Sequence, residues 1–176
     1  MKSAVSFAML TAVLVGALAV ANWMPSVIDR EVLRKYTSVE SVQRDLHMDK
    51  IYMPSYLPEY LRLNSIPVEI YAQKKPFSMV LLHFQSWDSK DIGLIVHQIS
   101  AKADYHPESE IKLGSVIRRS KVSIKGRDGL LITAECEKRG TCNQVSWTEG
   151  NYLLKVISKG SARDVIRIAA SMIPDA

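Results

Sequence analysis

The sequence contains only two cysteines, Cys136 and Cys142, and neither follows the apolar segment near the N-terminus closely enough to carry a lipid anchor. The sequence also lacks the patterns G-x-S-x-G, G-x-G-x-x-G and G-x-x-x-x-G-K-[ST]. Their absence removes the usual signatures of a serine-hydrolase elbow, a dinucleotide site and a phosphate loop. An enzyme is thereby disfavoured but not excluded, because catalysis needs converging groups rather than a motif.

Histidine is scarce as well, and its spacing does not indicate a metal site. The four histidines, which form neither an i, i+4 helical pair nor an H-x-H strand pair, are His47, His83, His97 and His106. His83 and His97 fall on neighbouring predicted strands, but coordination usually needs a third ligand. We therefore expect no metal, no cofactor and no catalytic residues. An enzyme would need groups such as His83, His97 and Asp104 to converge in one cleft.

No charged residue occurs between residues 3 and 23, and this run is almost wholly apolar. About 20 apolar residues can cross a bilayer as a helix. Lys2 precedes the run, and this early positive charge favours an N-terminus in the cytoplasm. We predict a hydrophobic N-terminal helix within residues 1–25 that acts as a transmembrane anchor or a signal peptide.

The fate of this segment stays open between two alternatives. Ala19 and Ala21 give the small-x-small pattern of a signal-peptidase site, and cleavage after Ala21 would release a periplasmic or secreted chain. The run is longer than the usual signal core, and Trp23 suits an interfacial position, which favours the uncleaved anchor. The preferred prediction is a single-pass membrane protein whose main domain lies outside the cytoplasm.

A length of 176 residues suits one domain plus an extension. We expect an anchor or signal peptide over residues 1–25, a juxtamembrane helical region over 26–49 and an extracytoplasmic α+β domain over 50–176. Apolar residues at helical spacing predict one helix up to residue 35. They also predict a second short helix capped by Thr37 or Ser38.

The main domain is predicted to be a mainly antiparallel sheet, because short turn-like separators favour antiparallel neighbours in a meander. The sheet has about six or seven short strands, in segments 67–72, 78–86, 92–100, 115–124, 130–137, 143–148 and 152–158. Ser161 as N-cap and an apolar stripe from Val165 to Met172 predict a C-terminal helix that covers the sheet and ends at Pro174. The expected fold class is α+β.

Cys136 and Cys142 lie at the facing ends of two predicted strands, with five residues between them. A hairpin loop of that length brings the two positions near disulfide distance. In an oxidising compartment we expect a bond that stabilises the fold by about 2 kcal/mol. The alternatives are a free buried pair or half of a metal site.

The formal net charge is +5, and part of the positive charge clusters along one pair of strands. The cluster comprises Arg118, Arg119, Lys121, Lys125 and Arg127. Its functional interpretation is contact with anionic headgroups or an acidic partner; its structural interpretation, which we favour, is protection of an edge strand. The charge balance alone names no partner, and we expect no nucleic acid.

Several short segments follow an order found in known bacterial proteins. Residues 122–131 give paired strands, residues 145–152 carry W-x-x-G-x-Y, and residues 166–172 end in A-x-S-M. Residues 54–60 are similar to an opening phrase P-x-Y-L-P-x-G-Y, although the glycine is missing. Over about residues 50–174, the chain resembles an uncharacterised extracytoplasmic domain that follows a transmembrane helix in some anti-sigma-factor-like and sporulation-associated membrane proteins. The resemblance implies a β-rich domain with a closing helix and no catalytic residues.

Together these features predict a non-enzymatic, membrane-tethered extracytoplasmic domain. It would bind an envelope partner protein or serve as an accessory or sensor module, with residues 3–23 as its membrane contact. The alternative is an exported carrier or binder of an apolar ligand, which requires an apolar pocket under the sheet. A hydrolase is the least favoured prediction.

Overall fold

The structure, a computed structural model, describes residues 33–62, 67–75, 77–87, 91–103, 111–136 and 140–175. The predicted N-terminal helix and its cleavage site fall on residues 1–32, outside the described residues. Within the ranges described, no helix is both long enough and apolar enough to cross a bilayer.

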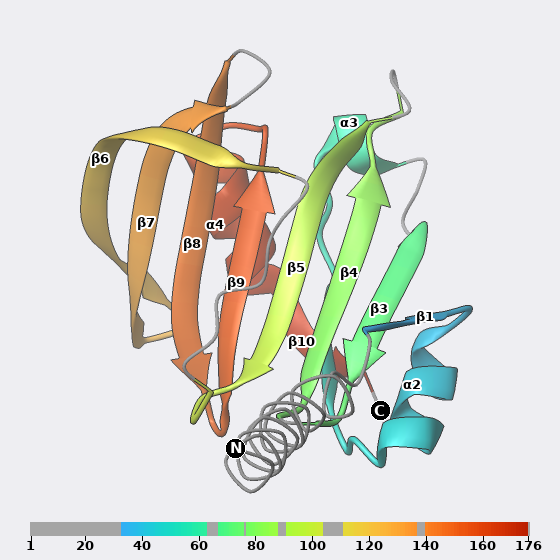
Figure 1. Ribbon diagram of the computed structural model, residues 1–176. Helices are drawn as coiled ribbons and strands as arrows, with labels where there is room; N and C mark the ends of the chain where they lie inside the picture. Colours follow the sequence, from blue (N-terminus) through green and yellow to red (C-terminus); the bar gives the residue numbers. More distant parts are fainter. Residues whose placement is uncertain are drawn as a thin grey trace, which may run out of the picture. The chain divides into compact units, whose positions relative to one another are not determined.

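An eight-stranded antiparallel sheet dominates the fold (Figure 1). Its strands are β1 (Arg34–Tyr36), β3 (Glu69–Gln73), β4 (Met79–Gln85), β5 (Ile92–Ser100), β6 (Leu113–Ile124), β7 (Arg127–Cys136), β8 (Thr141–Glu149) and β9 (Tyr152–Ser158). Their order across the sheet is β1-β3-β4-β5-β9-β8-β7-β6. Two further strands, β2 (Ile51–Pro54) and β10 (Met172–Asp175), pair with each other in a separate antiparallel sheet.

The strand order consists of two meanders joined in the middle of the sheet, rather than the single meander expected. Strands β3, β4 and β5 follow one another, and the chain then resumes at the far edge with β6. Three hairpins lead back through β7 and β8 to β9, which pairs with β5. Turn residues identify each hairpin in the sequence, but they do not specify that the meander β6–β9 pairs with the meander β3–β5 through β9 and β5.

The fold is mainly β, so the α+β expectation is wrong. Each of the seven predicted segments overlaps a strand, but β1 extends the sheet to eight and β2 with β10 adds a second sheet. The helices are short: α2 (Val39–Leu46), α3 (Glu59–Arg62) and α4 (Ala162–Ser171). An apolar N-terminal helix is not seen among the described residues.

Strand β1 occupies residues that the apolar spacing assigned to the end of a helix. Its three residues pair with β3, and Lys35 lies opposite Tyr71. The Lys35 Nζ atom is 2.6 Å from Glu69 Oε1 on β3. Pairing with β3 gives the backbone of β1 hydrogen bonds within the sheet. A short isolated helix, in contrast, is only marginally stable in water. Tertiary contacts therefore override the local pattern here.

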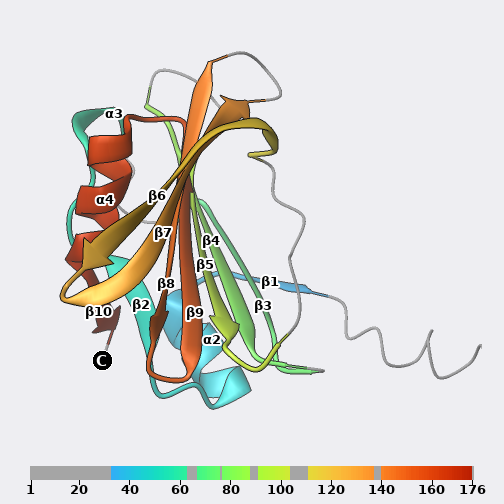
Figure 2. The ribbon, with the colours of Figure 1, turned by 90° about the vertical axis from the view of Figure 1, so that its left-hand side faces the viewer.

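Helix α4 runs along one face of the large sheet (Figure 2). Ser161 Oγ accepts a hydrogen bond from the Asp164 backbone N–H at 3.1 Å, which satisfies a donor that the first helical turn leaves open. Val165, Ile168 and Ala169 are buried in the main core. The helix ends at Ser171, because Met172–Asp175 form strand β10 and pair with β2.

Helix α2 packs into the same core. Ser38 and Ser41 form a reciprocal capping box at its start, with Ser38 Oγ accepting from the Ser41 N–H at 3.2 Å. Val39, Val42 and Leu46 are its buried side chains. The short helix predicted after Thr37 is therefore present, and Ser38 is its cap.

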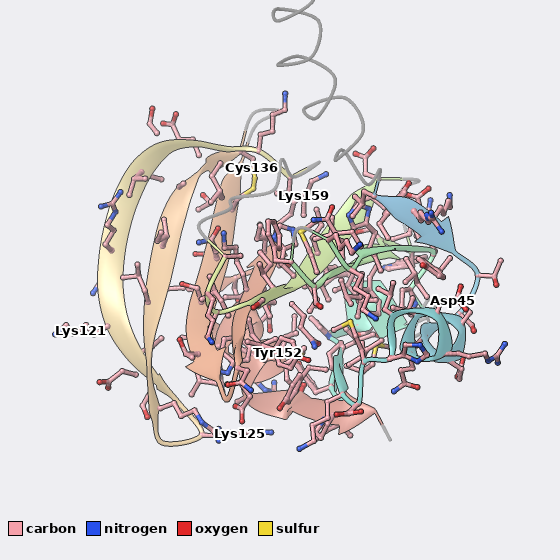
Figure 3. All side chains as sticks on the ribbon, turned by 60° about the horizontal axis from the view of Figure 1, so that its bottom comes forward. Asp45, Lys121, Lys125, Cys136, Tyr152 and Lys159 are labelled. Atoms are coloured by element: carbon pink, nitrogen blue, oxygen red, sulfur yellow. A yellow bond between two sulfur atoms is a disulfide. The ribbon has the colours of Figure 1, made fainter. Side chains whose placement is uncertain are left out.

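The expected disulfide between Cys136 and Cys142 is confirmed, with 5.3 Å between the two Cα atoms. It closes the β7–β8 connection, where the Cys136 N–H also donates to the Gly140 carbonyl at 2.9 Å. Cys136 pairs with Leu113 at the start of β6 (Figure 3 marks its position). The disulfide thus links the facing ends of β7 and β8, and the start of β6 lies beside it in the ladder.

Candidate functional site

The face of the large sheet opposite α4 carries polar side chains between two small apolar clusters. Alternation along the strands places His83, His97 and Lys155 on this face. The clusters are Ile95, Ile111, Cys142 and Ile157 in one, and Met79, Leu81 and Ile99 in the other. His83 and His97, which were predicted on neighbouring strands, therefore share a face, because the β4–β5 register sets Leu81 opposite His97 and His83 opposite Ile95.

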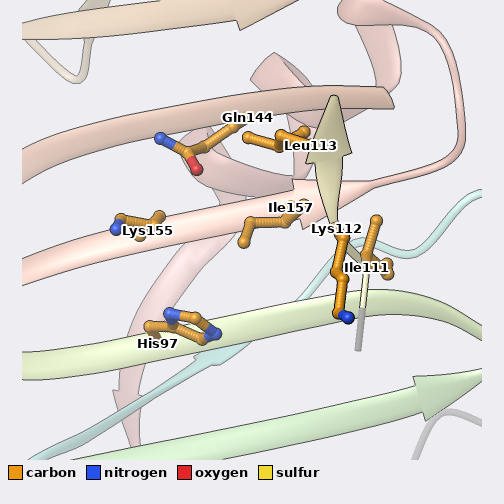
Figure 4. Close-up of a pocket in the computed structure, with 7 residues that line it drawn as sticks. All are labelled: His97, Ile111, Lys112, Leu113, Gln144, Lys155 and Ile157. Carbon is orange, nitrogen blue, oxygen red and sulfur yellow. The ribbon is translucent and has the colours of Figure 1, made fainter. Parts of the chain in front are cut away.

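A pocket of about 330 Å³ lies on this face (Figure 4). Its described lining residues are His97, Ile111, Lys112, Leu113, Gln144, Lys155 and Ile157. Strands β5, β9 and β8 supply its floor, and the segment that leads into β6 supplies one wall. Its volume is at the lower end of the range of small-molecule sites.

His97 is the most unusual residue of the pocket. It is only 1% exposed, yet neither ring nitrogen has a hydrogen-bond partner among the described residues. Burial, aided by the charges of Lys155 and His83, lowers the pKa of His97 to about 3. The ring is therefore neutral near pH 7 and offers one N–H donor and one acceptor nitrogen.

Lys155 lies directly opposite His97 in the β5–β9 ladder. Burial lowers the pKa of Lys155 from its ordinary value, and no described carboxylate forms an ion pair with its ammonium. The side-chain amide of Gln144, on the next strand, likewise has no partner among the described residues. None of the described lining residues is acidic. The polar part of the pocket is therefore rich in donors and cationic.

His83 belongs to a different group on the same face. Its Nδ1 atom is 3.5 Å from Glu69 Oε2, and its ring centroid is 5.4 Å from that of Tyr71. The hydrogen bond from Lys35 lowers the pKa of Glu69. Within the described ranges, no group of three or more His, Cys, Asp or Glu residues could hold a metal ion. Asp104 and His106, two of the polar residues considered in the sequence, fall in residues 104–110 and lie outside the described residues.

Two members of the predicted basic cluster are engaged by groups near the β6–β7 hairpin. Lys125 Nζ donates to the Met172 carbonyl at 2.6 Å, and Arg127 forms an ion pair with Glu149 at 2.6 Å. The first contact joins the hairpin to β10, and the second joins β7 to β8. These two cations are exposed, but each is already engaged by a group on another strand.

The other three members, Arg118, Arg119 and Lys121, are exposed on β6. Figure 3 shows Lys121 on the outer side of that strand. Arg118 Nε donates to Ser120 Oγ at 3.1 Å, and neither Arg119 nor Lys121 forms an ion pair with a described residue. Val116 and Ile117 beside them are 46% and 61% exposed. The exposed part of β6 therefore combines positive charge with apolar side chains.

Strand β6 ends the described sheet, and no described strand pairs with its outer side. The turn that joins β6 to β7 has φ of 51° at Lys125 and 79° at Gly126, which is typical of a two-residue type I′ hairpin. In such a hairpin the flanking pair Ile124–Arg127 is hydrogen-bonded, and pairs then alternate along the ladder. The backbone N–H and C=O groups of Arg119 and Lys121 consequently point away from β7.

Lys155 and Gln144 were not among the residues predicted from the sequence, and His97 was considered there as a metal ligand or as part of a catalytic cleft, not as a binding residue. A signal was present, since Lys155 interrupts the apolar run 153–157 and His97 interrupts 94–99. A polar residue inside an otherwise apolar strand, as at Lys155 or at His97 with its neighbour Gln98, marks a buried or half-buried polar position. Only the register shows that the two positions face each other.

No protein-family model, curated protein or solved structure matches the chain. The structure therefore offers two candidate surfaces, the pocket around His97 and the outer side of β6.

Proposed function

We propose that this protein is a non-enzymatic, membrane-tethered extracytoplasmic domain that binds an acidic, extended segment of an envelope protein along β6. The apolar run 3–23 would serve as the tether, and the Cys136–Cys142 disulfide is consistent with an oxidising compartment. The resemblance to domains that follow a transmembrane helix supports the same location. The observation that carries the proposal is the open edge of β6.

An extended peptide can join a sheet at an open edge, where main-chain hydrogen bonds supply affinity. The outward backbone groups of Arg119 and Lys121 are available for such bonds. The side chains of these two residues would attract carboxylates, which favours an acidic partner and disfavours a basic one. Val116 and Ile117 would add apolar contact next to this segment.

The same side chains also protect the edge from unspecific pairing, since cations and bulges are common devices for that purpose. Two register shifts occur, between Leu113 and Val116 and between Val116 and Arg118. From Arg118 to Ile124 the pairing with β7 is regular. The edge of β6 is therefore irregular before Arg118, which disfavours pairing there, and regular from Arg118 to Ile124, where an added strand could pair.

The test uses the full-length chain in nanodiscs of zwitterionic lipid and a heptapeptide in which glutamate alternates with valine. We expect saturable binding of this probe and at least tenfold weaker binding of a peptide with lysine in place of glutamate. Arg119→Glu combined with Lys121→Glu should lower the affinity for the acidic peptide at least tenfold. The matched control, Lys50→Glu with Lys102→Glu, alters two exposed lysines away from β6 and should stay within twofold.

Three results would contradict the proposal. They are equal binding of both peptides, an equal effect of the two double variants, and binding to anionic nanodiscs without binding to the acidic peptide. The last result would assign β6 to a membrane surface instead. Intact mass and fractionation of the expressed protein test the tether separately, because cleavage after Ala21 would yield a soluble chain that starts at Asn22.

A further inference from the structure

We propose that the pocket around His97 and Lys155 binds a small amphipathic anion, with its carboxylate or phosphate group beside these two side chains and its apolar part against Ile157, Ile111 and Leu113. This site lies on a face of the sheet and does not depend on a partner at β6. The two proposals can therefore fail independently.

The headgroup preference follows from the polar groups of the lining that have no hydrogen-bond partner among the described residues. Buried polar atoms in folded proteins nearly always have a hydrogen-bond partner. His97 has none among the described residues, although it is 1% exposed and lines the pocket. An oxyanion would accept from its N–H and compensate the half-buried ammonium of Lys155, which lies on the neighbouring strand.

The same arrangement disfavours other classes of ligand. A cation would meet Lys155 and Lys112 with no carboxylate among the described lining residues. A purely apolar ligand would leave the nitrogens of His97 buried without partners, which costs free energy. A ligand with an anionic head and an apolar tail satisfies both parts of the lining.

The size and the walls of the pocket limit the tail. At about 30 Å³ for each non-hydrogen group, a volume of about 330 Å³ holds roughly ten such groups. Ile111 and Ile157 belong to an apolar cluster that also contains Cys142, with Leu113 packed against it. The disulfide therefore supports the wall against which a tail of about six carbons would lie.

The experiment uses the full-length chain in zwitterionic nanodiscs, with protein-free nanodiscs as the blank. The probes are hexanoate and hexyl phosphate, with hexanol lacking the charge and acetate lacking the tail. Binding is followed through the ¹⁵N and ¹³C signals of labelled histidine. We expect both anionic probes to shift the His97 signals saturably, and hexanol and acetate to bind at least tenfold more weakly.

The variant Lys155→Met keeps an unbranched side chain and removes the ammonium, so it should weaken hexanoate binding at least tenfold. The control Lys159→Met removes an exposed lysine that directly follows the same strand and should change the affinity less than twofold. Because variants of buried residues can unfold, thermal unfolding of each protein is measured first. His97→Gln is the second variant; because it lacks the reporter ring, its hexanoate affinity is measured by titration calorimetry alongside the wild type, and it should also be weaker.

Saturable binding by hexanol that equals hexanoate binding would overturn the proposal, as would unchanged hexanoate affinity in a folded Lys155→Met protein. Absence of any probe binding would overturn it as well. Nanodiscs that contain anionic lipid distinguish a lipid headgroup from a free small anion as the natural ligand. If these nanodiscs shift the His97 signals and hexanoate competes with them, the site is supported and its ligand is a lipid headgroup.

Discussion

Lys155 stands directly opposite His97 across the central β5–β9 ladder, so an ammonium and a neutral imidazole are neighbours on a largely buried face. Cross-strand neighbours on one face have Cβ atoms about 5 Å apart, close enough for one charge to act on the other. The lysine therefore contributes to keeping the histidine uncharged. Both side chains remain dependent on solvent or a ligand for polar partners.

This pair predicts that stability depends on pH in the acid range. The pKa of His97 is about 3 in the folded chain, against 6.5 for a histidine in water, so the unfolded chain binds the extra proton first. Stability should be full above about pH 6.5 and fall by about 1.4 kcal/mol per pH unit as the pH decreases toward 3. Chemical denaturation at several pH values between 6.5 and 5 measures this slope.

The variant His97→Gln should flatten that slope, because glutamine does not titrate. The titratable groups that face His97 are Lys155 and His83, with Lys112 also lining the pocket, and all three remain in this variant. His47→Asn changes an exposed histidine whose φ of 52° asparagine tolerates, and it should keep the wild-type slope. Equal slopes for wild type and His97→Gln would show that His97 does not resist protonation.

Removal of the disulfide should lower stability modestly. Replacing Cys136 and Cys142 together with alanine should cost about 2 kcal/mol, because the bond closes a short loop. Unfolding in denaturant, with and without reductant, measures the difference. Reductant should lower the stability of the wild type by a similar amount and leave the double variant unchanged; a larger effect on the double variant would point to another target of the reductant.

Gly160→Ala should destabilise the fold by about 1–3 kcal/mol, because an added Cβ would overlap the Tyr60 hydroxyl. That hydroxyl lies 2.9 Å from Ser158 Oγ, which also accepts from the Gly160 N–H at 3.0 Å. Tyr60→Phe removes the overlapped oxygen. The alanine substitution should therefore cost less in the Tyr60→Phe background, and strictly additive effects in this double-mutant cycle would contradict the overlap.

A pair of proline substitutions tests which backbone groups of β6 face outward. Lys121→Pro removes an outward N–H and should change stability by less than about 1 kcal/mol. Ser120→Pro removes an N–H that bonds to β7 and should cost about 3 kcal/mol or more. Thermal or denaturant unfolding compares the two variants directly. The reverse order of their effects would mean that β6 is paired in the opposite phase.

The local elements of this fold were predictable where one residue pattern decides them. The Ser161 cap and the stripe at Val165 and Ile168 predicted α4, and turn residues between apolar runs predicted the hairpins of β6 to β9. Cysteine spacing predicted the Cys136–Cys142 bond. In each case the partners are close in sequence, so local rules apply.

Long-range pairing was not predictable in the same way. β1 has three residues, and its strand form depends on an edge of β3 more than thirty residues away. The pocket depends on the register that sets Lys155 opposite His97, and a shift of one residue would have moved one of them to the α4 face. Periodicity within a strand fixes its two faces but not its neighbour.

The junction of the two meanders also has a consequence for the order of events in biogenesis. Strand β5 receives its second neighbour only when β9 is available, and α4 follows β9 in the chain. A chain that leaves a ribosome or a translocon N-terminus first would therefore carry β5 with one open side until β9 has emerged. The β5–β9 ladder, which joins the two meanders, is therefore a long-range pairing that can form only after the hairpins of β6 to β9 have been synthesised.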